Sequence, residues 1–234
     1  MDDNFKKLVR KFNDFQKYPI YNSGSELILQ IPQLRELKDL ITGIAQFSSD
    51  LKLQYAWKCL SLDLDVERSI NMIAEYVTDS DRAYYVSNEF RKIVLSSSYL
   101  SSSMIAFIMG RVVRENRMCT HKEIVIANAL ADMSDYDVYN YVDIYDNCSY
   151  MLGGYEVVDS NKTTHDKVSC QYTVQMCVSK GIFKTESAII GTDYGDDEKT
   201  ADNSLYGGMY YVKTEYSHEL RELINEVRQL LGRR

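Results

Sequence analysis

Apolar residues recur every three or four positions along most of this chain, which is the spacing of one face of an α-helix. Only Pro19 and Pro32 interrupt the 234 residues, so almost nothing forbids a helix interior after residue 32. The pattern predicts roughly six or seven amphipathic helices before about residue 146. We therefore expect a mainly α protein in which residues 1–146 form a multi-helix bundle. The first of these helices carries the following apolar residues: Phe5, Leu8, Val9, Phe12 and Phe15.

Capping residues predict where several of these helices begin. Asp79 or Ser80 can accept from the free N–H groups of the helix that follows. Thr120 and Glu123 match a capping box, in which each side chain bonds to the backbone of the other residue. Ser134 then begins a short acidic helix.

The chain changes character after about residue 150, where eight of its eleven glycines lie. Residues 147–165 have turn composition and are predicted to link the bundle to a second unit, residues 166–234. In that unit we predict a helix ending at Gly181, two strands and a final helix. These four elements cover residues 166–180, Ile182–Ile190, Met209–Lys213 and Ser217–Leu231.

The order helix, glycine turn, strand, loop, strand, helix in residues 166–232 resembles the closing half of a winged-helix module. Val178–Phe183 resembles the exit from the family's third helix, and Tyr210–Thr214 resembles its second wing strand. The resemblance implies a small α+β unit whose third helix would read DNA and whose wing would contact phosphate. The nucleic-acid-binding side chains would then be Lys167, Gln171 and Lys180. The corresponding wing tip, Asp193–Lys199, is acidic and favours protein contact over phosphate.

The amino-acid composition disfavours several classes of protein. A formal net charge of −7 disfavours a general nucleic-acid coat. Five cysteines without paired spacing indicate reduced thiols and a cytoplasmic protein. The N-terminus lacks a secretory signal pattern, and no apolar run is long enough to cross a bilayer. No cofactor is predicted, because the chain carries neither a phosphate-binding loop nor a dinucleotide fingerprint.

One pair of residues suggests catalysis. Arg114 stands seven residues before His121 at the junction of two predicted helices, which resembles the Arg-x4–6-His signature of HEPN ribonucleases. The resemblance implies that Arg114 steadies a phosphate while His121 supports attack by an RNA 2′-hydroxyl. A solvated basic turn is the alternative interpretation. Arg111, Arg114 and Arg117 recur every three residues and would form a basic ridge for nucleic acid.

The sequence indicates a metal site less strongly than it indicates the Arg114–His121 pair. Cys119 and His121 could join His165 and either Cys170 or Cys177 in a zinc site. Structural zinc sites commonly use two close pairs of ligands, and the second pair is missing here. We therefore predict no metal site.

Three hypotheses about function follow. The first is a non-enzymatic binding or regulatory protein that acts through a protein partner or self-association, similar overall to helical proteins of bacterial chromosomes and prophages. Its contact surface would be the apolar face of the final helix: Leu220, Leu223, Ile224, Val227, Leu230 and Leu231. The alternatives are a HEPN-like RNA-cleaving enzyme in a toxin or phage-defence setting, and a winged-helix DNA-binding regulator.

Overall fold

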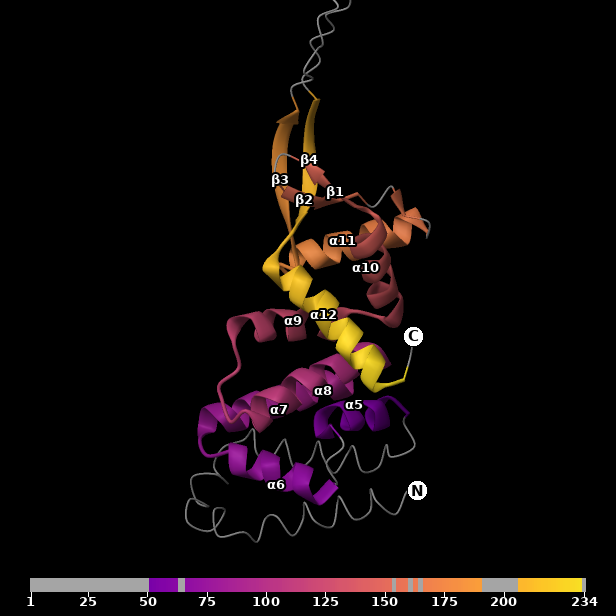
Figure 1. Cartoon of the computed structure of the whole chain (residues 1–234). Coiled ribbons are helices and arrows are strands. Elements are labelled where there is room, and N and C mark those ends of the chain that lie inside the picture. Colours follow the sequence, from indigo (N-terminus) through magenta and orange to yellow (C-terminus); the bar gives the residue numbers. More distant parts are fainter. Residues whose placement is uncertain are drawn as a thin grey trace, which may run out of the picture. The chain divides into compact units, whose positions relative to one another are not determined.

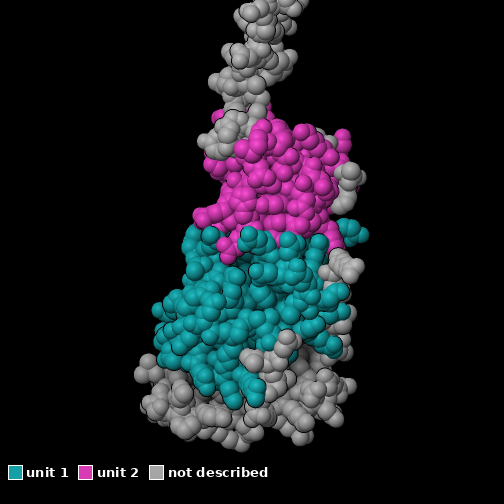
Figure 2. Space-filling model, viewed as in Figure 1, with its two compact units in different colours: residues 1–138, 222–234 teal, residues 139–221 magenta. Residues whose placement is uncertain are grey.

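The structure is a computed structural model that describes residues 51–62, 66–152, 155–159, 162–163, 166–190 and 206–232 (Figure 1). The predicted helices before residue 50, the acidic wing tip and His165 lie outside these residues. The chain divides into two compact units, one of residues 1–138 with 222–234 and one of residues 139–221 (Figure 2).

The first unit is built from helices. Its described elements are α5 (Leu51–Ser61), α6 (Val66–Tyr76), α7 (Ser80–Leu95), α8 (Tyr99–Arg114) and α9 (His121–Asp132). Helix α10 (Asp135–Asn147) begins in this unit and continues into the second.

Helix α8 forms the centre of the first unit and packs against α5, α6, α7 and α9 (Figure 1). It is apolar around most of its circumference, which suits a helix surrounded by others. Gly110 brings α8 close to α5, because a Cβ at this position would lie 2.5 Å from the carbonyl oxygen of Leu60. A glycine inside a helix weakens it, but here the missing side chain gives room for the neighbouring backbone.

The predicted helix starts are confirmed. The Asp79 carboxylate accepts from the backbone N–H groups of Asp81 and Arg82 at 3.0 and 2.9 Å. Thr120 and Glu123 form the predicted capping box at the start of α9. These motifs are local, so a short stretch of sequence specifies them.

The second unit combines helices with a small antiparallel sheet. Its strands are β1 (Ser149–Leu152), β2 (Tyr155–Val158), β3 (Phe183–Ile190) and β4 (Tyr206–Lys213), in the order β1-β2-β4-β3. Helix α11 (Lys167–Ser179) precedes β3, and Gly181 turns the chain between them with a φ of 77°. Helix α12 (Glu215–Leu230) begins in this unit and ends in the first.

Two aromatic side chains of α10 connect the helices of the second unit to its sheet. The ring of Tyr141 stacks on Phe183 of β3, with 5.7 Å between the ring centroids. Its hydroxyl donates to the backbone carbonyl of Ser217 in α12 at 2.5 Å. Tyr145 lies under the ammonium group of Lys213, which also pairs with the Glu156 carboxylate at 2.5 Å. The interior of this unit is therefore aromatic and polar as well as aliphatic.

The predicted fold class is confirmed at the level of a mainly helical protein with a small antiparallel sheet near its C-terminus. The two predicted strands and the final helix are present, with ends shifted by at most three residues. Residues 147–165, predicted as turns, contain β1 and β2 instead, and β2 pairs with β4. The winged-helix arrangement stays a prediction. No helix among the described residues combines the length and apolar character needed to cross a membrane.

Candidate functional site

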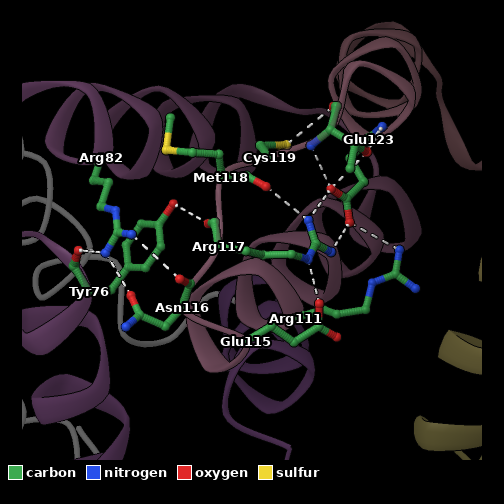
Figure 3. A network of polar contacts seen from close by, with 10 residues as sticks. Tyr76, Arg82, Arg111, Glu115, Asn116, Arg117, Met118, Cys119 and Glu123 are labelled. Carbon is green, nitrogen blue, oxygen red and sulfur yellow. Dashed lines mark hydrogen bonds and ion pairs between the residues drawn. The ribbon is translucent and has the colours of Figure 1, made fainter.

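The predicted basic ridge lies where α8 ends and α9 begins, and Figure 3 shows its polar contacts. Glu123 is at the centre of this network, although its side chain is only 3% exposed. Arg117 donates to both of its carboxylate oxygens, at 2.7 and 2.6 Å, and Arg111 lies 3.3 Å from one of them. Two of the three ridge arginines thus pair with a buried carboxylate of the same unit.

The pKa of Glu123 reflects opposing effects. Burial favours the neutral acid, but hydrogen bonds from Arg117 and Thr120 outweigh it and lower the pKa to about 2. The carboxylate is therefore ionised at neutral pH. It serves both as a capping-box acceptor for α9 and as the counter-ion of Arg117.

The loop between the two helices is held from α6 and α7 as well. The Tyr76 hydroxyl donates to the carbonyl of Arg117 at 2.9 Å. Arg82 donates to the side-chain oxygen of Asn116 at 2.6 Å and lies over the Tyr76 ring (Figure 3). Asn116 itself has a φ of 48°, a left-handed conformation that asparagine tolerates better than most residues. This loop is fixed by contacts on both sides.

Arg114, the predicted phosphate-binding residue, contacts the neighbouring helix. Its guanidinium donates to the carbonyl of Leu60, in the last turn of α5, at 2.9 Å. A cation at a helix C-terminus satisfies a free carbonyl and complements the helix dipole. The contact assigns Arg114 a structural role at the end of α5.

His121 is the exposed first residue of α9. The structure gives no substrate position from which its chemistry with Arg114 could be derived, so RNA cleavage stays a prediction. Burial raises the pKa of the nearby Cys119 to about 11, and the thiol is therefore protonated and a poor nucleophile at neutral pH. No three His, Cys, Asp or Glu side chains gather as a metal site within the described parts of the chain.

The predicted interface on the final helix is largely covered by the chain itself. Leu220, Leu223, Ile224 and Val227 are buried. Leu230 and Leu231 are partly exposed. Only the end of this apolar face is accessible to a partner, because the rest already belongs to the protein's core.

Helix α11 presents a different surface, of which Lys167, Gln171 and Lys180 are the predicted nucleic-acid-binding residues. Lys167 and Gln171 are exposed and Lys180 is partly exposed, as that role requires. The same side of the helix also exposes Val168 and Tyr172, at 72% and 70%. Cys170, Thr173, Val174 and Cys177 face the interior instead.

Gln175 extends this exposed surface toward the sheet. It lies one turn beyond Tyr172 and donates to the hydroxyl of Tyr211 in β4 at 2.6 Å. No charged residue occurs between Lys167 and Lys180, so the middle of the helix is apolar and amide-rich. We call Val168, Gln171, Tyr172 and Gln175 the α11 surface. In the sequence, Val168 and Tyr172 stand four positions apart and do not belong to the buried face that Cys170, Val174 and Cys177 form. This spacing could have identified the surface.

Comparison with known protein families, with curated protein sequences and with solved structures finds no match for this chain.

Proposed function

We propose that this protein is a non-enzymatic binding protein that contacts a protein partner through the α11 surface. The observation that supports the proposal is the exposure of Val168 and Tyr172, one helical turn apart, on a helix whose opposite side is packed in the core. Tyrosine is frequent in the centres of protein interfaces, because its ring buries a large area with few rotatable bonds.

Charge distinguishes a protein partner from nucleic acid. Binding to a phosphate backbone needs several lysines or arginines on one surface. Lys167 and Lys180 stand at the two ends of the helix, and the α11 surface between them carries no lysine or arginine. Depletion of charge in the centre of a surface, with polar groups around it, is the pattern of a protein interface.

Site-specific photocrosslinking tests the proposal. A benzophenone amino acid in place of Tyr172 should give one defined crosslinked protein in an extract of the source cells. The same amino acid in place of Tyr136 is the matched control, because Tyr136 is 79% exposed and lies in the other unit. We expect the crosslink at position 172 to disappear in Val168→Asp and to survive nuclease treatment.

Other results would contradict the proposal. Equal crosslinking from positions 136 and 172 would indicate non-specific contact. A crosslink that nuclease removes, together with duplex binding that weakens in Lys167→Ala and Lys180→Ala and at higher salt, would favour the DNA-binding alternative.

A further inference from the structure

Strand β3 forms one edge of the sheet of the second unit, and its inner side pairs with β4 along all eight residues. Among the described residues, no strand pairs with its outer side. In an antiparallel pair, alternate residues of an edge strand direct their N–H and C=O groups away from the neighbouring strand. An edge of this length can accept another strand.

The other edge is much shorter. Strand β1 has four residues against the eight of β3, and it would offer a correspondingly smaller number of backbone hydrogen bonds. If another strand adds to this sheet, the β3 edge can form more backbone hydrogen bonds with it than the β1 edge can.

The charges on β3 indicate what kind of strand fits. Lys184 and Glu186 are two residues apart, so both side chains lie on the same face of the sheet. Each is about half exposed, and their charged groups lie 2.9 Å apart. Thr185, between them, is exposed on the opposite face.

These positions are self-complementary about Thr185. If two copies of β3 pair antiparallel with a two-fold axis at this residue, Lys184 of each copy stands opposite Glu186 of the other. Opposite charges directly across a strand pair stabilise it, whereas like charges destabilise it. The pairing also sets Thr185 opposite itself and Phe183 opposite Ser187. A two-fold contact needs a surface that complements itself, and this segment meets the requirement.

We propose that β3 is a self-association edge, through which two copies of this protein pair antiparallel about Thr185 and join their sheets. The intrachain pair of Lys184 and Glu186 does not oppose this, because exposed ion pairs contribute little and each lysine also comes opposite a carboxylate of the other copy. The edge shares no residue with the α11 surface, although Thr185 pairs with Tyr211, which Gln175 contacts. The tests of the two proposals change different residues, so the two proposals can fail independently.

Two variants with reversed charges, measured alone and as a mixture, test the proposal. Lys184→Glu makes the segment entirely acidic, and Glu186→Lys makes it entirely basic, so each variant alone sets like charges opposite each other at both positions. We expect each reversal to weaken self-association about tenfold or more relative to the natural protein. An equimolar mixture of the two variants restores both opposite pairs and should associate again. Light scattering after size exclusion measures the mass in each case.

The mixture also controls for folding, because mixing changes no contact within either chain. Circular dichroism should show that each variant keeps its helix content. The proposal is overturned if the natural protein stays monomeric at every concentration tested, if the single reversals associate as the natural protein does, or if the mixture associates no more than its components.

A cysteine pair tests the register. In a Cys119→Ser background, Thr185→Cys should crosslink two copies under mild oxidation, because residues on the axis face each other at about 5 Å between Cβ atoms. Ser187→Cys is the matched control. Position 187 is exposed on the same face as position 185. In the proposed register it lies opposite Phe183 of the other copy, so the two cysteines at position 187 would be four residues out of register. Crosslinking at position 187 and none at 185 would exclude this register.

Discussion

Arg117 donates from its two terminal nitrogens to the two carboxylate oxygens of Glu123, at 2.7 and 2.6 Å. The two residues are six positions apart in the sequence: Arg117 lies in the loop that joins α8 to α9, and Glu123 lies in the first turn of α9. The pair gives Arg117, one residue of the predicted basic ridge, a counter-ion within the protein and ties the loop to the first turn of α9. Substitution of Glu123 therefore measures how much the pair stabilises the protein.

Glu123→Gln should lower the free energy of unfolding by about 2 kcal/mol, because it removes a buried charge-assisted pair and weakens the capping box. Chemical denaturation followed by circular dichroism measures the change. Glu115→Gln is the matched control. Glu115 contacts the same arginine but is half exposed, so its loss should cost less than about 0.5 kcal/mol. Equal losses of unfolding free energy in the two variants would show that the burial of Glu123 does not strengthen its pair with Arg117.

The same carboxylate should make stability depend on pH. The pKa of Glu123 in the folded protein is about 2, below its ordinary value of 4.5. Its contribution is therefore fully present above about pH 4.5 and is lost as the pH falls toward about 2. The difference in unfolding free energy between the natural protein and Glu123→Gln should shrink across that window. A difference that stays constant with pH would contradict the assigned pKa.

Gly110→Ala should destabilise the protein by about 1–3 kcal/mol, although alanine favours helices more than glycine does. The added Cβ would lie 2.5 Å from the Leu60 carbonyl and would push α5 away from α8. Thermal unfolding measures the loss. Gly181→Ala provides a comparison with open space around the new Cβ, where the cost of about 1–2 kcal/mol comes from the left-handed backbone alone. A more stable Gly110→Ala protein would show that the helices can separate at no cost.

Arg114→Ala should reduce stability by about 1 kcal/mol, because the Leu60 carbonyl loses its donor. His121→Ala should change stability by less than about 0.5 kcal/mol, since this side chain is exposed. An RNA-cleavage assay on the same two variants tests the remaining enzymatic hypothesis. Cleavage by the natural protein that both substitutions abolish, while both variants stay folded, would revive it.

Tyr141→Phe should cost about 1–2 kcal/mol, because it removes a buried hydrogen bond to Ser217 while keeping the ring stacked on Phe183. Tyr145→Phe should cost less than about 1 kcal/mol, since its hydroxyl contacts the exposed His218 and water can replace that contact. Urea denaturation of the two variants gives the comparison. The reverse order would mean that Tyr145 has the larger structural role.

The missed hairpin shows where the sequence interpretation failed. Gly153-Gly154 is itself a hairpin signal, but the flanking strands have only four residues each and lie in a stretch rich in turn formers. Such short strands are stable only when a further strand supports them. That support comes from β4, about 50 residues later in the chain, and no local pattern reports it.

Within the described residues, the sequence by itself determined the helices, the caps at Asp79 and Thr120, and the two long strands. These depend on contacts between residues a few positions apart, such as Thr120 with Glu123, and on the repeat of apolar positions. Only the tertiary structure decided which of the singled-out side chains remain available. It set Arg117 against Glu123 and Arg114 against Leu60, covered most of the final helix, and left Val168 and Tyr172 exposed. The physical reason is that the burial and pairing of a side chain depend on distant segments, whereas its helical conformation depends mainly on its neighbours.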